Sequence, residues 1–577
     1  MKNKEIADIF NEIADLLEIK GENPFRIRAY RRASQNLEGL TKDVVSLSRD
    51  ELLEIPGIGH DLAEKIEEYI KTEKVKSLED IKKEIPEGLA ALLSIPSLGP
   101  KTAKLLHEKL KVKNIAELEK LAREHKLIGL PGIKEKTEEN ILKGIGMLKR
   151  GKDRQPLGRV IPIASDIVNQ LKKNAPLEKI EIAGSLRRMK DTVRDIDILA
   201  TSKNPHDVMK AFMHLPHVKE VLMHGTTKSS IVTKEGIQAD LRVIEDESFG
   251  AALAYFTGSK EHNIRLREMA VKKGLKLNEY GIFREKDNKK LGGKDENDVY
   301  KILGMQFIPP EMREDRGEIE AAQKDSLPRL IELGDIRGDL HVHTSQSDGS
   351  HTLEELIEAA RQRGYEYIAI TDHSKGLGVA RGLNEERLME EKKEVDALNK
   401  KLKGFRLLMG VEVDIRSDGK MDFDNEILSR MDIVVASIHS GFRQSKEQIT
   451  KRLVSAMKNP YVSVIAHPTG RLIGERDPYE VDMEYILKVA QETGTAIEIN
   501  AYPLRLDLNY IYAQKAKDLG VKLVISTDTH LVSQFAYMHY GVSIARRGWL
   551  EKRDVLNTLK YEQLMKALWR KRKRNFT

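Results

Sequence analysis

The 577-residue sequence has no cysteine, only two tryptophans and no apolar run long enough to cross a membrane. The absence of cysteine excludes disulfide bonds and thiolate ligands, so any metal site must use imidazoles and oxygens. Residues 1–5 begin an amphipathic helical pattern that lacks the apolar core of a signal peptide. We therefore expect a cytoplasmic protein.

Charged residues of both signs are abundant. The 98 Lys and Arg residues outnumber the 91 Asp and Glu residues, which gives a formal net charge of +7. A modest positive excess suits nucleic acid as a partner, although many soluble proteins share it. The length predicts roughly three to five domains.

A candidate phosphate site begins at Gly184-Ser185, after a strand-like run at residues 179–183. A glycine in a tight turn lets backbone N–H groups approach a phosphate without a Cβ in the way. Arg187 and Arg188 then add positive charge. The segment therefore predicts phosphate binding.

Three aspartates lie in the strands that follow. Asp195 and Asp197 are two residues apart on a predicted strand at 193–200, so they share a face, and Asp240 lies in a third strand-like run at 238–243. Carboxylates suit Mg²⁺ or Mn²⁺, and two such ions stabilise the entering and leaving oxygens of a phosphoryl transfer. An Asp-x-Asp pair alone is common at strand ends without metal. The neighbouring glycine, serine and arginines favour the catalytic interpretation.

A second motif, Tyr-Phe-Thr-Gly-Ser at 255–259, precedes a helical run with Asn263 and Arg267. Together these segments resemble the palm and nucleotide-binding region of the family X DNA polymerases, members of the nucleotidyltransferase superfamily. The resemblance implies that Asp195, Asp197 and Asp240 are catalytic and hold the metals. It assigns nucleotide binding to Gly184, Ser185, Arg188, Tyr255, Phe256, Gly258, Ser259, Asn263 and Arg267. Arg194, Lys260 and His262 depart from residues that many relatives carry.

Three similar segments occur in the first 150 residues, at 55–59, 95–99 and 130–134, each before an amphipathic helical run. Each resembles a helix-hairpin-helix, in which a glycine turn and a helix N-terminus bind DNA phosphate without reading sequence. One such turn is more often an ordinary helix connection, but three favour DNA. By this resemblance Gly57, Gly59, Gly99 and Gly132 contact DNA, while Ser97 and Lys134 depart from the motif.

Residues 23–33 carry basic side chains between aromatic ones and are similar to the small domain that holds the 5′-phosphate of a gap in the same polymerases. Lys65 falls where relatives with 5′-deoxyribose-phosphate lyase activity carry a Schiff-base lysine. Asp61 stands where those relatives are basic. We predict that Lys65 contacts DNA; for a lyase role, a solvated lysine on a helix face is the alternative.

The second half alternates apolar strand-like runs with helical patterns, which predicts a β/α barrel with functional residues at the carboxyl ends of its strands. Six of the chain's 16 histidines fall at or near such ends, among aspartates and glutamates. A lone histidine there is usually a hydrogen-bonded core residue, whereas a repeated pattern indicates metal ligands. The candidates are His341, His343, Asp348, His373, Glu412, His439, His467, Asp528 and His530.

This pattern resembles the polymerase and histidinol phosphatase (PHP) domain, a distorted seven-stranded barrel that holds up to three metal ions. All nine ligand positions of that family are filled here, which implies an active hydrolase of phosphate esters. Imidazoles and carboxylates fit Mn²⁺, Zn²⁺ or Fe²⁺ and do not choose among them. Arg381 and Arg443, near the predicted rim, are either phosphate-binding residues or ordinary surface charges.

The expected fold class is therefore multidomain α+β and α/β, with helical hairpin domains, a mixed-sheet palm and a distorted (βα)7 barrel. We expect a small helical DNA-binding domain at 1–85, further hairpins at 86–150, the palm at 151–247, a nucleotide-binding subdomain at 248–317, a linker at 318–335 and the barrel at 336–577.

The resemblance implies a family X DNA polymerase that fills gaps in base excision repair. Its expected partners are deoxynucleoside triphosphates and gapped or nicked DNA with a 5′-phosphate, and we expect a monomer. The barrel implies a Mn²⁺-dependent 3′→5′ exonuclease, and family precedent adds abasic-site cleavage and 3′-phosphate removal. Two alternatives are a phosphoesterase of small esters whose first half only tethers it to DNA, and a non-catalytic scaffold at DNA ends.

Overall fold

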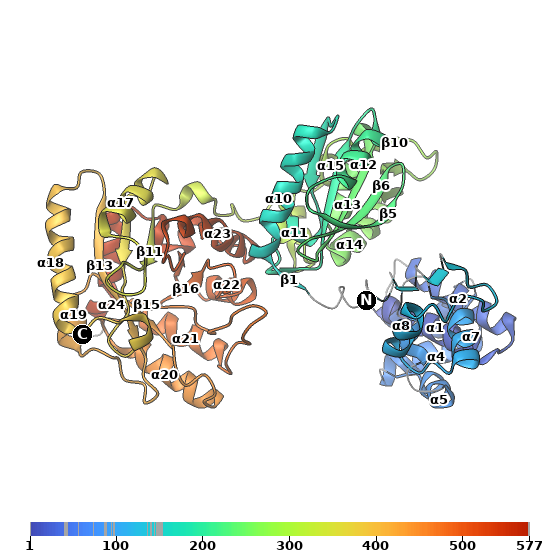
Figure 1. Cartoon of the computed structure of the whole chain (residues 1–577), viewed down its shortest axis with the longest axis horizontal. Helices are drawn as coiled ribbons and strands as arrows, with labels where there is room; N and C mark the ends of the chain where they lie inside the picture. The colour runs from blue at the N-terminus through green and yellow to red at the C-terminus, as the bar shows by residue number, and fades with distance from the viewer. Residues whose placement is uncertain are drawn as a thin grey trace. The chain divides into compact units, whose positions relative to one another are not determined.

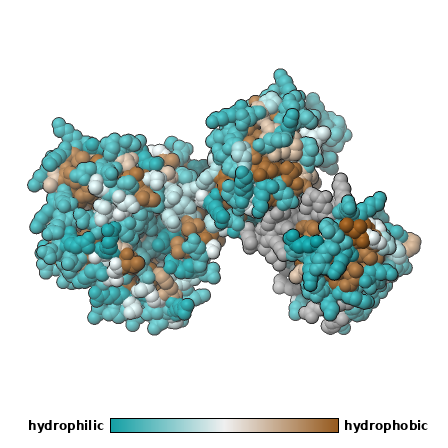
Figure 2. All heavy atoms as spheres, viewed as in Figure 1, coloured by the Kyte–Doolittle hydropathy of each residue, from teal (hydrophilic) through white to brown (hydrophobic). Residues whose placement is uncertain are grey.

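The computed structural model contains two compact units, residues 1–154 and 155–577 (Figure 1). Hydrophilic side chains cover most of the visible face of each unit, and hydrophobic side chains show as separate patches (Figure 2). Among the described residues, no helix is both long and apolar enough for a membrane span. The structure describes residues 2–39, 44–55, 57–72, 74–85, 89–93, 95, 98–135, 137–138, 141–142, 145 and 154–574.

The first unit is helical and packs around its own apolar core, which includes Phe10, Tyr30 and Ile66. Amphipathic spacing explains this arrangement, because each helix buries one apolar stripe against its neighbours. The helices are α1 (Lys2–Lys20), α2 (Pro24–Gly39), α3 (Arg49–Leu53), α4 (His60–Thr72), α5 (Lys76–Glu84), α6 (Leu89–Leu92), α7 (Pro100–Leu110) and α8 (Ile115–Arg123), with a short 3₁₀ turn, η1 (Val44–Ser46).

The three predicted hairpin turns share one backbone hydrogen bond between described residues. In each, the N–H of the fourth residue donates to the carbonyl of the first, at 3.0, 3.1 and 2.9 Å. The fourth residues, Ile58, Leu98 and Ile133, are buried, so an apolar anchor holds each turn on the core. Pro56, Pro96 and Ser97 lie outside the described residues.

The second unit begins with the palm, a five-stranded sheet in the order β2-β4-β7-β6-β5. Strands β4 and β7 are parallel, and the other neighbours are antiparallel. Strands β1 and β3 form a separate, two-stranded antiparallel sheet. The elements are β1 (Gln155–Pro156), α10 (Leu157–Asn174), β2 (Lys179–Ile182), α11 (Gly184–Arg187), β3 (Thr192–Val193), β4 (Asp195–Thr201), α12 (Pro205–Met213), β5 (Val218–His224), β6 (Lys228–Thr233) and β7 (Gln238–Ile244).

The predicted nucleotide-binding subdomain has a separate core and an antiparallel sheet, β10-β9-β8. Part of the expected linker differs from the prediction, because residues 318–323 form a helix whose Ile319 and Ala322 are buried in this core. The elements are η2 (Asp246–Ser248), α13 (Phe249–Thr257), α14 (Lys260–Lys272), β8 (Leu275–Asn278), β9 (Gly281–Arg284), β10 (Lys290–Gly292), α15 (Glu296–Ile302), η3 (Pro310–Met312), α16 (Glu318–Gln323) and η4 (Leu333–Asp335).

Seven parallel strands, neighbours in chain order from β11 to β17, form the barrel. A bridge between Val342 and Thr529 brings its first and last strands together, which confirms the predicted barrel. The strands are β11 (Gly338–Val342), β12 (Tyr367–Ile370), β13 (Arg406–Asp414), β14 (Ile433–Ser437), β15 (Val464–Ile465), β16 (Ala496–Asn500) and β17 (Leu523–Ser526).

Helices surround the barrel strands in Figure 1. The last helix covers the barrel interior with Leu564, Met565 and Leu568, which pack with inward residues of the strands. One continuous apolar core joins the outer faces of the strands to the palm. The helices are α17 (Leu353–Gln362), α18 (Glu385–Lys401), α19 (Asn425–Ser429), α20 (Lys446–Lys458), α21 (Met483–Thr493), α22 (Tyr510–Asp518), α23 (Met538–Arg547) and α24 (Tyr561–Arg574); the short 3₁₀ turns are η5 (Gly378–Ala380), η6 (Val532–Tyr537), η7 (Lys552–Asp554) and η8 (Leu556–Thr558).

Replacing Gly338→Ala should destabilise the barrel. A Cβ at this position would lie 2.2 Å from the carbonyl oxygen of Tyr367 on the neighbouring strand. We expect a loss of about 1–3 kcal/mol in the free energy of unfolding, measured by thermal or urea denaturation. Gly334→Ala is the matched control, since a Cβ there meets no atom within 4 Å. Equal stability of both variants would contradict the packing argument.

Candidate active sites

The palm aspartates come together through strand register. Asp197 of β4 is the direct partner of Asp240 on parallel β7, and Asp195 lies on the same face of β4. Burial, with the negative charges of Asp195 and Asp240, raises the pKa of Asp197 to about 7, against the opposing effect of Arg242 and Lys228. Such a pKa marks a shortage of positive charge at this point, which a divalent cation would supply.

Gly184 makes room for one of these carboxylates. It has a positive φ of 65°, and a Cβ on it would lie 2.3 Å from Asp197 Oδ2. The sequence suggested that this glycine serves a close approach by phosphate. In the structure, the group that approaches it is the carboxylate of Asp197. Ser185, the next residue, lies half-buried in α11.

Arg187 and Arg188 join the palm to the nucleotide-binding subdomain. Arg187 donates two bonds to Glu296, at 2.7 and 2.8 Å, and one to Thr257 Oγ1 at 2.8 Å. Arg188 donates from Nη1 to the backbone oxygen of Thr257 and from Nε to Glu314 at 3.1 Å. The two segments that carry the predicted nucleotide-binding residues are therefore in contact.

The residues predicted to border the nucleotide lie around the end of α13. Tyr255, Asn263 and Arg267 line one small pocket, and Asn263 Nδ2 donates to the Tyr255 carbonyl at 2.6 Å. Phe256 packs under the guanidinium of Arg242, 4.6 Å from its ring centre. Gly258, with φ +71°, ends the helix, and the peptide bond that follows it is cis. Ser259 is buried, and its hydroxyl accepts the first-turn N–H of α14 at 3.2 Å, so this side chain caps a helix.

Glu412 lies at the centre of the barrel cluster, fully buried at the end of β13. Five histidines surround its two oxygens. Its Oε2 is 3.4 Å from His341, 3.7 Å from His343 and 2.9 Å from His373, and its Oε1 is 3.3 Å from His439 and 3.1 Å from His467.

Two aspartates complete the cluster. Asp528 Oδ1 lies 3.2 Å from His343 Nε2, and Asp348 lies 3.3 Å from His530 and 3.5 Å from His373. The structure thus brings all nine predicted residues together. Three subsets have ligand atoms within 4.8 Å of one another, and each could hold an ion: His343, Asp348, His373 and His530; His341, His343 and Asp528; and His373, Glu412 and His439.

The cluster fits divalent cations in donor chemistry and in charge. Several buried ligand atoms lie close to one another without the geometry of a hydrogen bond: His341 Nε2, both ring nitrogens of His343, His373 Nδ1, His467 Nδ1 and Glu412 Oε2. Burial alone would raise the pKa of Glu412, but the surrounding histidines hold it well below its usual range. Burial and neighbouring histidines lower the pKa of His343 to about 4. Burial opposes protonation of His373 and His530, but the neighbouring carboxylates raise the pKa of His373 to about 10 and of His530 to about 9. A metal ion bound by these imidazoles would therefore take the place of their protons.

Sequence reasoning missed residues behind the ligands. Glu498, fully buried on β16, lies 2.8 Å from His341 Nδ1 and accepts the backbone N–H of His467 at 2.7 Å. Asp414 lies 3.1 Å from His439 Nδ1. Such partners fix the orientation of a ligating imidazole. The available signal was a glutamate inside the otherwise apolar run Ala-Ile-Glu-Ile of β16.

At the rim, Arg381 and Arg443 are exposed. Arg505, which the sequence did not single out, is mostly buried and lies 3.6 Å from Asp528 Oδ2. An arginine in contact with a candidate ligand is better placed to receive a phosphate than an exposed one. Arg505 belongs to the loop after β16, so the arginine that contacts a candidate ligand comes from a segment other than those of Arg381 and Arg443.

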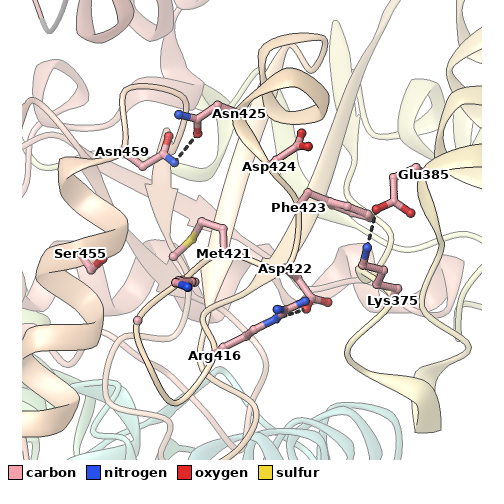
Figure 3. A pocket seen from close by; sticks show the side chains of 12 residues that line it. Lys375, Glu385, Arg416, Met421, Asp422, Phe423, Asp424, Asn425, Ser455 and Asn459 are labelled. Atoms are coloured by element: carbon pink, nitrogen blue, oxygen red, sulfur yellow. Dashed lines mark hydrogen bonds and ion pairs between the residues drawn. The ribbon is translucent and has the colours of Figure 1, made fainter.

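An open pocket of about 540 Å³ is lined mainly by residues 416 and 419–425, which follow β13 (Figure 3). Two ion pairs, Lys375 with Glu385 and Arg416 with Asp422, line it. Asp422 also accepts the hydroxyl of Ser374, the residue after His373, at 3.0 Å. The pocket wall is therefore directly bonded to the segment that carries a candidate ligand.

In the helical unit, the predicted DNA-binding glycines lie in the hairpin turns. Gly57 and Gly132 have φ of +85° and +83°, which an L side chain rarely adopts, and a Cβ at Gly59 or Gly99 would meet no atom within 4 Å. Lys65 is only 13% exposed and its Nζ lies 2.5 Å from Asp61 Oδ1. Lys65, the lysine considered for lyase chemistry, is thus paired with Asp61, which stands where the relatives with lyase activity carry a basic residue.

Comparison with known families matches four segments of the chain. Residues 1–75 match the helix-hairpin-helix domain, and 89–146 match the SAM-like helix-hairpin-helix tandem. Residues 252–314 match the DNA polymerase beta thumb, and 339–502 match the PHP domain.

Curated relatives agree with these matches. The chain is 42% identical over 560 residues to the DNA polymerase/3′-5′ exonuclease PolX of Bacillus subtilis, which covers 96% of this chain and 97% of that protein. It is 30% identical to a probable phosphatase of Thermoanaerobacter sp., in a match that covers 38% of this chain and 89% of that protein. It is 31% identical to a probable phosphatase of Caldanaerobacter subterraneus, in a match that covers 41% of this chain and 92% of that protein.

The fold and sites define a nucleotidyltransferase palm, with hairpin and thumb regions, joined to a PHP-type phosphoesterase barrel. The chain belongs to the family X DNA polymerases that carry a PHP domain. Enzymes of this kind use divalent metals, and the barrel contains groups of His, Asp and Glu able to hold them.

Gly184→Ala should impair the palm while leaving the barrel intact. The added Cβ would displace the Asp197 carboxylate, and a displacement of about 1 Å in a catalytic group costs about 100-fold in rate. We expect primer extension to fall by at least that factor in a gel assay. Shortening of DNA by the same preparation should persist and serves as the folding control. Extension at the normal rate would contradict the role assigned to Gly184.

Proposed function

We propose that this chain extends DNA primers with deoxynucleotides at the palm and shortens DNA 3′ ends at the barrel. The observation that carries the proposal is twofold: one chain places three palm aspartates on one face of neighbouring strands, and it gathers nine barrel residues in a separate cluster. The family supports the same interpretation, since its Bacillus subtilis member is named a DNA polymerase/3′-5′ exonuclease.

At the palm, Asp195, Asp197 and Asp240 would hold two Mg²⁺ or Mn²⁺ ions. When bound, such ions stabilise the charge of a phosphoryl transfer. Arg188 would bind the triphosphate, and Gly184 would keep Asp197 in place. The remaining nucleotide-binding residues would orient the deoxynucleoside triphosphate, so that the primer 3′-hydroxyl attacks its α-phosphate and pyrophosphate leaves.

At the barrel, the nine clustered residues would hold up to three Mn²⁺, Zn²⁺ or Fe²⁺ ions, which activate water and polarise a phosphate ester when bound. Glu498 and Asp414 would orient His341 and His439. Arg505 would receive the phosphate beside Asp528. Together these residues support a Mn²⁺-dependent 3′→5′ exonuclease, with abasic-site cleavage and 3′-phosphate removal as related reactions.

The helical unit would bind the DNA backbone through its hairpin turns and hold the 5′-phosphate of a gap with the basic residues of 23–33. We propose that the substrate is gapped or nicked DNA, that the process is base excision repair, and that the protein acts as a monomer. We also propose the domain boundaries predicted from the sequence, except that residues 318–323 belong to the nucleotide-binding subdomain.

The deciding experiment is a denaturing-gel assay of a labelled primer in a short gap with a 5′-phosphate. Mn²⁺ is present, and deoxynucleoside triphosphates are either added or omitted. Extension with nucleotides and shortening without them would support both activities. Shortening alone would limit the palm to DNA binding. The absence of both, with hydrolysis of p-nitrophenyl phosphate, would favour a phosphoesterase of small esters.

Single substitutions should separate the two activities. Asp197→Ala removes a palm carboxylate and should abolish extension while sparing shortening; His341→Ala removes a barrel ligand and should do the reverse. Both variants are measured on the gapped substrate, with circular dichroism as the control for folding. Loss of both activities in either folded variant would reject two independent sites.

Glu412→Gln should reduce metal binding by the barrel. Glu412 contacts five histidines, and an amide supplies less negative charge than a carboxylate. We expect at least one fewer ion per chain after dialysis against Mn²⁺, measured by elemental analysis. Asp197→Asn is the matched control, because it should leave the barrel ions in place. Unchanged metal content in Glu412→Gln would exclude this glutamate as a ligand.

A further inference from the structure

The barrel packs against the palm beside its candidate phosphate site. Gly158, near the start of α10, approaches the barrel so closely that a Cβ would lie 2.1 Å from Pro503 Cβ. Arg471, in a barrel loop, donates to Asp191 Oδ2 at 3.2 Å. Asp191 lies three residues after Arg188, so these contacts fix the turn that carries a predicted triphosphate ligand.

Arg547, the last residue of barrel helix α23, reaches this turn directly. Its side chain is fully buried. Nη1 donates to the backbone oxygen of Arg188 at 2.5 Å, and Nη2 donates to Glu314 Oε1 at 3.1 Å. The ring of Tyr510 lies 4.2 Å from the guanidinium carbon. A planar guanidinium group can donate hydrogen bonds in two directions while it stacks on an aromatic ring, which the ammonium group of a lysine cannot do.

Glu314 connects Arg547 to the side chain of Arg188. Its Oε1 accepts from Arg188 Nε at 3.1 Å as well as from Arg547, and Lys190 Nζ lies 3.8 Å from Oε2. Burial alone would raise the pKa of Glu314, but Arg547, Arg188 and Lys190 hold it below its usual range. One carboxylate is therefore shared among three cations, and Arg188 is only partly neutralised.

We propose that Arg547 is a positioning residue for the nucleotide site of the palm. It shares the negative charge of Glu314 and holds the backbone of Arg188, so that Arg188 keeps positive charge for the triphosphate. The inference rests on the proposed polymerase function. Without Arg547, Glu314 would neutralise Arg188 more completely and the turn would lose an anchor, and both effects weaken nucleotide binding. The hydrolase barrel thereby forms part of the polymerase site.

The test measures KM and kcat for a deoxynucleoside triphosphate on gapped DNA with the full chain. Arg547→Met should raise KM about tenfold, as expected for the loss of about one charge-assisted hydrogen bond, with a smaller change in kcat. Arg547→Lys, which keeps the charge, should give a smaller rise. Shortening of DNA without nucleotides shows that the barrel is folded.

Arg546→Met is the matched control. Arg546 is the neighbouring residue on α23. It joins the barrel to the nucleotide-binding subdomain through Glu311 at 2.7 Å and to the predicted linker through the Ile331 carbonyl at 3.0 Å. Its contacts avoid Arg188 and Glu314. A purely structural role for Arg547 would make the two methionine variants alike, whereas a positioning role raises KM in Arg547→Met alone.

A double variant separates charge from packing. Arg547→Met with Glu314→Gln removes the excess negative charge, so its KM should fall back toward the wild-type value. A wild-type KM in folded Arg547→Met, an equal rise in Arg546→Met, or a double variant no better than Arg547→Met would each overturn the proposal. If Arg547→Met fails to fold, an unchanged KM in Arg547→Lys overturns it. A wild-type chain that does not extend primers would instead reject the polymerase function itself.

Discussion

Buried negative charge is the constraint on which both sites depend. In the palm, Asp197 lies between Asp195 and Asp240, and burial with these neighbours raises its pKa to about 7. In the barrel, Glu412 is fully buried among five imidazoles. Such charge is stable only with compensating cations or hydrogen bonds. Gly184 gives the Asp197 carboxylate the space it occupies, and Glu498 orients His341, which faces Glu412.

Arginines connect parts of the second unit that carry different chemistry. Arg187 joins the palm to Glu296 of the nucleotide-binding subdomain, and Arg547 brings the barrel to the same turn. Because each arginine donates in several directions, one side chain can satisfy a carboxylate and a carbonyl of different segments. The two proposed active centres are therefore held by one packed structure, and the continuous apolar core between palm and barrel supports the same conclusion.

Much of this organisation could be predicted from local sequence. The alternation of Asp195 and Asp197, the repeated hairpin turns and the histidines after apolar runs are short-range patterns, and the structure contains the corresponding strands and turns. Other features could not be predicted. Glu498 meets His341 across 157 residues, because barrel closure brings the two strands together. Residues 318–323 resembled a charged linker, yet they form a helix whose Ile319 and Ala322 side chains are buried in a core.

The sequence by itself determined the chemical classes of the two sites, because the residue types and their spacing along single strands are local properties. It also limited the candidate ligands to imidazoles and oxygens, since the chain has no cysteine. Tertiary structure alone decided which charges meet. The pairing of Arg188 with Glu314, the contact of Arg547 with both, and the contact of Arg505 with Asp528 depend on how distant segments pack. Those contacts join positions far apart in sequence, where no short-range pattern records them.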